Sequence, residues 1–197
     1  MKIAFLLYPA VTQLDFAGPA QILTRLKDAS VHFVAKTKEP VATDAGFSVI
    51  PTDCFSDIHS ADILCVPGGL GSTEAMEDEE TLAWVAKIGE QSQWITSVCT
   101  GSMILAAAGL LKGYRVTGGG VTAGIDFGFA LSATIQGEDH AKLIQLEYEY
   151  DPAIPLAGGT PETADAHILA QANNNLAYML PNHRERIVKI AERFGFQ

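Results

Sequence analysis

Short apolar runs alternate with amphipathic stretches along the chain, beginning at its first residues. Four continuous apolar runs, each bounded by turn residues, have the length and pattern of strands buried on both faces: residues 2–7, 31–35, 62–66 and 94–98. Three stretches have the composition or apolar spacing of helices: residues 16–27, 74–89 and 103–111. This alternation predicts a three-layer α/β fold, in which a mainly parallel central sheet is covered by helices on both faces.

The remaining segments predict smaller elements. Residues 41–50 have the pattern of a hairpin that turns at Asp44, Ala45 and Gly46. A long helical region is expected over 121–150, interrupted at Gly137, and residues 151–161 form an irregular, proline-rich segment. From residue 162 to the end, the pattern predicts one or two helices that separate near Pro181. We expect a single domain over 1–197.

Composition and charge exclude several classes of protein. The chain has 197 residues, of which 48% are hydrophobic and 18% charged, which is typical of a compact globule and not of a disordered chain. Its net charge of −10 repels phosphate backbones and anionic membranes, so neither nucleic acid nor a membrane is an expected partner. No apolar run reaches the roughly 18 residues of a membrane span, and the first residues lack a leader's cleavage site. We therefore expect a soluble, cytoplasmic protein.

Cys99 is the most specific candidate for a catalytic residue in the sequence. It follows an apolar run, precedes a helix, and is flanked by Thr100, Gly101 and Ser102, which are small enough for a tight turn like a nucleophile elbow. A thiol at a helix N-terminus is biased towards the nucleophilic thiolate. A buried structural cysteine is the alternative. The other two cysteines, in an apolar run and in a loop, have neither disulfide nor Cys-x-x-Cys metal spacing.

A glycine-rich turn ends the third apolar run at residues 67–71. The backbone N–H groups of Gly69, Leu70 and Thr100 can point into one crevice beside Cys99 and form an oxyanion pocket. A plain turn is the alternative. The segment lacks the spacing of a phosphate or dinucleotide cradle.

Asp15 lies in the first connection between a strand and a helix, at the same predicted edge of the sheet as Cys99. A carboxyl at the mouth of that crevice has a raised pKa and can act as a general acid or base near neutral pH. Its alternative is a simple helix cap. None of the five histidines follows a strand end near Cys99, so the sequence predicts neither a Cys-His pair nor a metal site.

Five segments together resemble the ThiJ/PfpI superfamily, and within it the isonitrile (isocyanide) hydratases. They are Tyr8-Pro9 with residues 12–19, then 66–69, 98–101, 108–111 and 118–126. The resemblance covers nearly the whole chain and implies a flavodoxin-like fold, also described as class I glutamine amidotransferase-like.

The resemblance also implies a chemistry. Such enzymes hydrate a small isocyanide to an N-substituted formamide without a metal or organic cofactor, and they form homodimers. Cys99 would attack the isocyanide carbon to give a thioimidate, Asp15 would transfer protons, and Thr100 would assist. Two alternatives stay open: a cysteine hydrolase or glyoxalase-like enzyme, and a catalytically silent redox sensor in which Cys99 is oxidised.

One stretch departs from the family pattern. Where relatives carry roughly two dozen further residues, about two strands and their turn, Val116 runs directly into Thr117. We therefore expect a shortened sheet, or an edge that a partner chain covers.

Overall fold

The computed structural model describes residues 1–113 and 119–195. Its centre is a five-stranded sheet in the order β5-β2-β1-β6-β7, and each neighbouring pair of strands runs parallel. In chain order the strands are β1 Lys2–Leu6, β2 Ser30–Ala35, β5 Asp53–Cys54, β6 Ile63–Val66 and β7 Trp94–Ser97. Of the three inner strands, β1 and β6 carry almost only buried apolar residues, which explains why their sequences read as continuous apolar runs.

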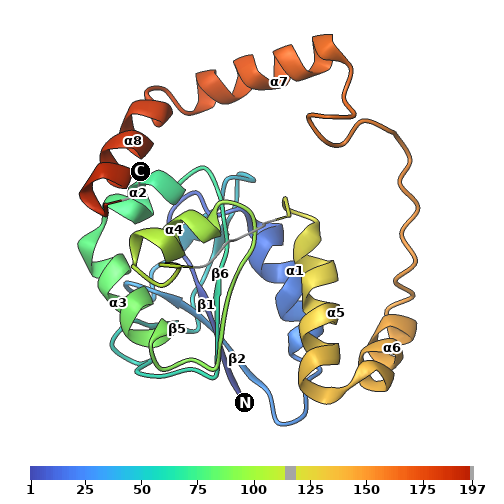
Figure 1. The fold of residues 1–197 in the computed structure, drawn as a ribbon. Coiled ribbons are helices and arrows are strands. Elements are labelled where there is room, and N and C mark those ends of the chain that lie inside the picture. Colours follow the sequence, from blue (N-terminus) through green and yellow to red (C-terminus); the bar gives the residue numbers. More distant parts are fainter. Residues whose placement is uncertain (114–118, 196–197) are drawn as a thin grey trace.

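Helices cover both faces of this sheet, as Figure 1 shows. One layer consists of α1 Gln13–Leu23, α5 Ala123–Gln136 and α6 Glu138–Glu147, which pack in that order. The other consists of α2 Ser72–Glu77, α3 Glu79–Gly89 and α4 Gly101–Ala107. The three-layer α/β prediction with a parallel sheet is confirmed.

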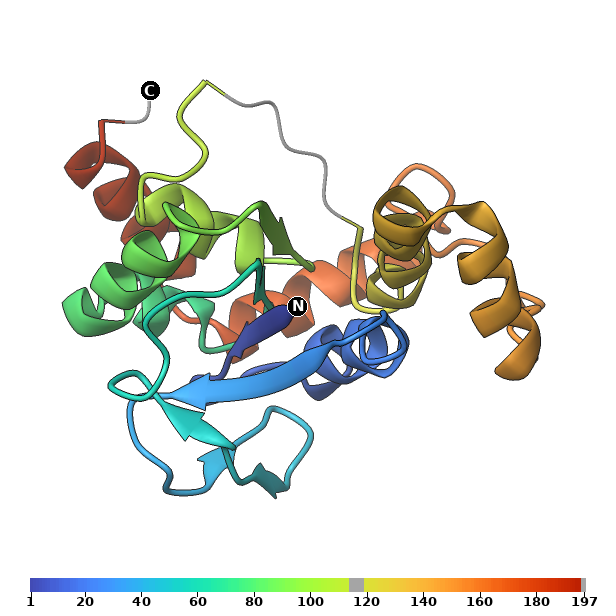
Figure 2. The same ribbon diagram turned by 90° about the horizontal axis from the view of Figure 1, so that it is seen from below.

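The expected hairpin is also present. Strands β3 Val41–Ala42 and β4 Ser48–Val49 pair antiparallel and turn over 44–46. This hairpin lies at the side of the sheet that carries β2 and β5 (Figure 2). An isolated bridge between Val11 and Thr43 joins it to the loop that follows β1.

Several predicted boundaries were wrong. The single helix expected over 74–89 is two helices, because the chain becomes extended at Asp78, whose carboxylate caps α3 by accepting the Thr81 N–H at 3.3 Å. Helix α1 begins at Gln13 and ends at Leu23, so Thr12 is its N-cap and Asp15 lies in its first turn. Helix α4 ends at Ala107. The short connection at Val116 and Thr117 lies outside the described residues.

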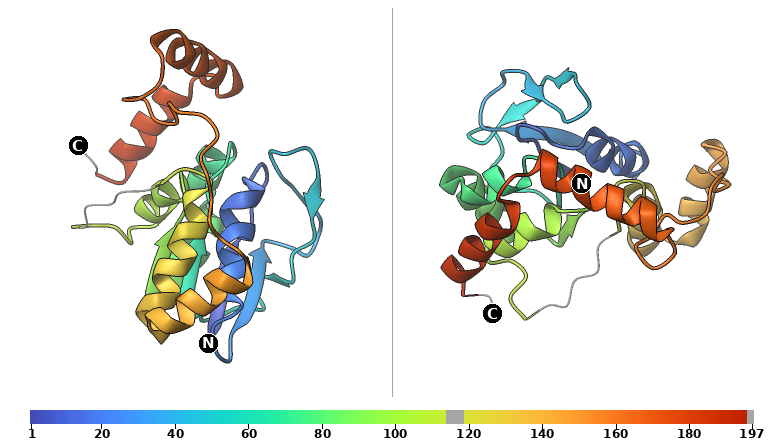
Figure 3. Two further views of the ribbon diagram at one scale, coloured as in Figure 1. Left: turned by 90° about the vertical axis from the view of Figure 1, so that its right-hand side faces the viewer. Right: turned by 90° about the horizontal axis from the view of Figure 1, so that it is seen from above.

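The C-terminal part of the chain leaves the three layers and returns to them. After α6, residues 148–165 form an extended connection to α7 Ala166–Met179, which passes above the carboxyl edge of the sheet (Figures 1 and 3). Helix α8 His183–Arg193 then docks on α2, where Arg186 forms ion pairs with Glu74 and Glu77 at 2.7 Å each. No described helix is long and apolar enough to cross a lipid bilayer.

Candidate active site

Cys99 lies between β7 and α4 in a strained backbone conformation. Its φ is +55°, in the left-handed region that non-glycine residues rarely occupy, and such strain is concentrated at functional sites. The turn depends on Gly101, because a Cβ there would lie only 2.0 Å from the Val66 carbonyl oxygen. The side chain of Cys99 is half-buried. The elbow predicted from the small flanking residues is therefore the geometry that the structure shows.

Asp15 reaches this region from the first turn of α1. Its side chain is fully buried, and its Oδ2 accepts a hydrogen bond from the Gly68 N–H at 2.8 Å. Its other oxygen, Oδ1, has no hydrogen-bond partner among the described residues. A buried carboxylate oxygen without a partner is unfavourable, so this atom is available to a proton or to a bound substrate.

The environment of Asp15 raises its pKa from the ordinary value of 3.8 to about 6. Burial is the main cause, because it disfavours the charged form. The Gly68 N–H opposes this shift by stabilising the carboxylate, and the nearby charge of Asp44 adds to it. Asp15 can therefore both accept and release a proton near neutral pH.

Asp15 and Thr100 converge on Gly68. A Cβ on Gly68 would lie 2.7 Å from Thr100 Oγ1 and 2.9 Å from Asp15 Oδ2, so only glycine lets both side chains approach. The Gly69 N–H donates to Thr100 Oγ1 at 3.1 Å. This amide, which the sequence suggested for an oxyanion pocket, thus holds the Thr100 hydroxyl in place.

The thiol of Cys99 is not biased towards the thiolate as its position in the sequence suggested. Burial raises its pKa, and the charge of Asp15 raises it further, while the N–H and hydroxyl of Thr100 act in the opposite direction. The resting residue is a protonated thiol that needs a base.

Two further residues of the site were missed by sequence reasoning. The buried Tyr8 hydroxyl donates to the Pro67 carbonyl at 2.9 Å, and its pKa is raised by burial and by the charge of Asp15, so it stays neutral. Asp44, at the hairpin turn, accepts a hydrogen bond from the Thr12 hydroxyl beside Asp15. Asp44 had no signal in the sequence beyond that of an ordinary turn residue.

Residues 1–124 match the model of the DJ-1/PfpI family. The chain belongs to the DJ-1/PfpI family. This match contains every site residue described above and covers more than half of the chain.

Individual relatives agree with this assignment. The isonitrile hydratase of Pseudomonas putida is 38% identical over an alignment of 226 residues that includes the whole of this chain and 99% of the relative. Because this chain has only 197 residues, the alignment leaves gaps in it, as the shortened stretch leads one to expect. A THiJ/PfpI family protein from Pseudomonas syringae has 36% identity and a TM-score of 0.89, covering 96% of this chain and 90% of that one. Oxidized Toxoplasma gondii DJ-1 shares the fold, with 18% identity, a TM-score of 0.67 and coverage of 77% and 99%.

The remaining cysteines of this DJ-1/PfpI protein form no hydrogen bond with Asp15, Cys99 or Thr100 among the described residues. Cys65 is fully buried in β6, and burial raises the pKa of its thiol to about 12, so it is inert at neutral pH. The half-buried Cys54 thiol donates to Asp57 Oδ2 at 3.2 Å in the loop after β5. Among the described residues no group of three or more His, Cys, Asp or Glu side chains has the geometry of a metal site.

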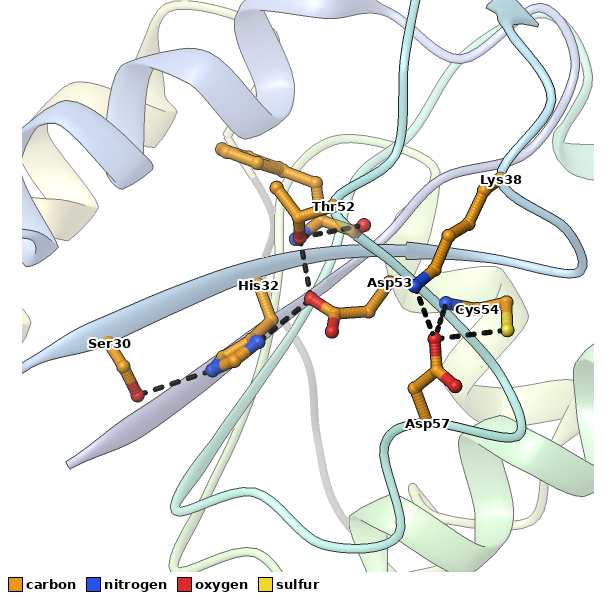
Figure 4. Close-up of polar contacts among 8 residues, drawn as sticks. Ser30, His32, Lys38, Thr52, Asp53, Cys54 and Asp57 are labelled. Carbon is orange, nitrogen blue, oxygen red and sulfur yellow. Dashed lines mark hydrogen bonds and ion pairs between the residues drawn. The ribbon is translucent and has the colours of Figure 1, made fainter.

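A second polar cluster, drawn in Figure 4, resembles a Ser-His-Asp triad. His32 Nδ1 lies 2.8 Å from Asp53 Oδ2, and His32 Nε2 lies 3.3 Å from Ser30 Oγ. A triad also needs oxyanion donors and a pocket beside the nucleophile. Ser30 is exposed, and the cluster lines neither the cavity of about 880 Å³ beside the loops after β1 and β2 nor the cavity of about 550 Å³ at the end of α6. Its contacts join β2 to β5.

A mostly apolar cavity of about 880 Å³ borders the Cys99 site. It lies between the loops after β1 and β2 and helix α2, and Tyr8 and Leu70 are among its lining residues. Cys99 and Asp15 do not line this cavity. Leu70, whose backbone N–H the sequence suggested for an oxyanion pocket, is one of the residues that line this cavity.

Proposed function

We propose that this protein hydrates small isocyanides to N-substituted formamides, with Cys99 as the nucleophile and Asp15 as the acid-base group. One observation carries the proposal: Asp15 is fully buried, keeps one oxygen unpartnered among the described residues, and has a pKa of about 6 at a site whose thiol is protonated at rest. A thiol with a raised pKa needs a base nearby, and such a carboxylate can serve.

The first half-reaction joins the enzyme to the substrate. The Asp15 carboxylate takes the proton of the Cys99 thiol, and the thiolate sulfur bonds to the terminal carbon of R–N≡C. Asp15 then returns the proton to the same carbon, which gives the thioimidate R–N=CH–S–Cys99. The Thr100 hydroxyl, held by the Gly69 N–H, supports this step by stabilising the sulfur anion.

Water completes the reaction. Asp15 removes a proton from a water molecule while the oxygen of that water bonds to the thioimidate carbon. Asp15 then gives this proton to the thioimidate nitrogen. The carbon–sulfur bond of the resulting adduct breaks as the hydroxyl proton passes to sulfur by way of Asp15, which releases R–NH–CHO and the Cys99 thiol. One water is consumed and no oxidant or reductant is needed. The 38% identity to an isonitrile hydratase supports this choice of substrate class.

The first alternative, a cysteine hydrolase or glyoxalase-like activity, has less support. Three of the five histidines form hydrogen bonds with residues outside the site: His183 contacts Thr73, His140 contacts the Arg25 carbonyl, and His32 contacts Asp53. A redox sensor is also less well supported, because sensor cysteines have lowered pKa values whereas the pKa of Cys99 is raised.

The test is a steady-state assay with a small alkyl or aryl isocyanide, following formamide by NMR. We expect turnover by the wild type, none above background by Cys99→Ala, and a loss of at least about 100-fold for Asp15→Asn. Cys54→Ser is the matched control and keeps full activity. No formamide from the folded wild type, or full activity of Cys99→Ala, would overturn the proposal.

A further inference from the structure

The cavity of about 880 Å³ beside helix α2 has no role in the proposed reaction. Its volume is in the range of about 300–1,000 Å³ that is typical of sites for small molecules. Leu7, Tyr8 and Ala75 are among its lining residues, and all three side chains are buried in the protein. The cavity therefore has both the size and the apolar walls of a ligand site.

Two closely packed loops lie between this cavity and Asp15. Gly71 is so close to the loop after β1 that a Cβ on it would lie 1.9 Å from the Pro9 carbonyl oxygen. Leu70 and Gly71 line the cavity, whereas Gly68, in the same turn, donates its N–H to Asp15. A molecule in the cavity would therefore occupy a site of its own, and binding there does not depend on the proposed function.

The segment between α7 and α8 closes one side of the cavity. Met179 and Leu180 in this segment are among the lining residues. Helix α8 is fixed to α2 by the ion pairs of Arg186 and by a contact of 2.9 Å between Thr73 Oγ1 and His183 Nδ1. A wall that is already fixed loses little conformational freedom when a ligand binds, so the cavity is preorganised.

The charged residues of the lining indicate the charge of the ligand. Carboxylates of Glu39, Glu74 and Asp78 line the cavity, against the single ammonium group of Lys36. Lys36 pairs with Asp78 at 2.7 Å, and Glu74 pairs with Arg186 at 2.7 Å. Glu39 is exposed and forms no ion pair with a described residue. The cavity therefore repels an anion and attracts a cation.

We propose that this cavity binds a small molecule that has an apolar alkyl or aryl body and a primary ammonium group. The body fills the apolar part of the cavity, and the ammonium group lies at the exposed edge beside the Glu39 carboxylate. Burial of the body supplies most of the affinity, because apolar surface leaves water. The exposed ion pair with Glu39 contributes less, and it selects the charge of the ligand.

Three probes of similar shape test the charge of the ligand: phenylbutylamine, phenylbutanol and phenylbutyrate. Isothermal titration calorimetry on the full chain at neutral pH measures their affinities. We expect the amine to bind about threefold more tightly than the alcohol, and the alcohol more tightly than the carboxylate. No binding of the amine, or equal binding of the amine and the carboxylate, would overturn the proposal.

Glu39→Gln tests the partner of the ammonium group. Glutamine keeps the size of the side chain and removes its charge. We expect a loss of about threefold in the affinity for phenylbutylamine and no change in the affinity for phenylbutanol. Equal effects on the two probes would show that Glu39 does not bind the ammonium group.

Ala42→Trp and Ala45→Trp test the location of the bound probe. Ala42 lines the cavity from β3 and is exposed, so a larger side chain there needs no space in the core. Ala45 is at the exposed turn of the same hairpin and does not line the cavity. We expect Ala42→Trp to weaken the binding of phenylbutylamine at least about tenfold, because the indole occupies the cavity, and Ala45→Trp to leave it unchanged.

NMR of the methionine methyl groups locates the probe independently. Met179 lines the cavity, whereas Met1 does not, and Met179→Leu assigns the resonance. We expect phenylbutylamine to shift the Met179 resonance and to leave that of Met1 in place. An unmoved Met179 resonance, or equal affinities of the two tryptophan variants, contradicts the location. These measurements need no turnover, so a protein that forms no formamide from isocyanides would still test this site.

Discussion

The Gly68 N–H donates to Asp15 Oδ2 across 2.8 Å, and this contact joins the end of β6 to the first turn of α1. It fixes one carboxylate oxygen inside the protein and leaves the other without a partner among the described residues. Because a Cβ on Gly68 would meet Thr100 as well as Asp15, the same glycine sets the positions of both side chains. The acid-base properties of the site therefore depend on a residue that has no side chain.

The raised pKa of Asp15 makes the stability of the protein depend on pH. The unfolded carboxyl titrates near 3.8 and the folded one near 6, so the folded state binds the proton more tightly. The contribution of Asp15 to stability is therefore most favourable below pH 3.8, falls as the pH rises to about 6, and is constant above that. Asp15→Asn removes this dependence.

We expect Asp15→Asn to gain stability relative to the wild type between about pH 4 and pH 7, by at most about 3 kcal/mol, since one pKa unit corresponds to about 1.4 kcal/mol. Urea unfolding at a series of pH values measures the difference. Asp151→Asn, at an exposed carboxyl, is the control and shows no comparable trend. A pH-independent difference for Asp15→Asn contradicts the burial argument.

Asp44→Asn tests the influence of the hairpin on the site. The charge of Asp44 raises the pKa of Asp15, so its removal lowers that pKa. The asparagine oxygen still accepts from the Thr12 hydroxyl, which preserves the contact. We expect the carboxyl resonance of Asp15 to titrate at lower pH in an NMR titration, and the acid limb of kcat/KM to move the same way. An unmoved resonance would show that Asp44 is too well screened to matter.

Gly68→Ala tests the close approach of Asp15 and Thr100. The added Cβ would lie 2.6 Å from the Thr100 nitrogen, which forces the backbone to shift. We expect a stability loss of about 1–3 kcal/mol and a loss of activity of at least about tenfold. Gly159→Ala is the matched control, because a Cβ there has no neighbour within 4 Å. Equal behaviour of the two variants in thermal unfolding and in the assay would contradict this account.

Much of the fold was predictable because its signals are local. A strand buried on both faces has to be apolar throughout, so β1 and β6 were recognisable as strands, and the small residues around Cys99 marked a tight turn. The break at Asp78 was missed because a carboxylate that caps a helix looks like any acidic residue in a helical run.

The alternation of apolar runs and helices determined by itself that a parallel sheet carries Asp15 and Cys99 at one edge. Only the tertiary structure decided what those residues can do, since pKa depends on burial and on neighbours that are distant in sequence. It placed the Gly68 N–H on Asp15, brought Asp44 to the site on a hairpin, and raised the pKa of a thiol that its sequence position had suggested to be acidic. The tertiary structure also decided that α7 has no buried residue. The sequence pattern of a helix shows which of its faces is apolar, but it does not show what packs against that face.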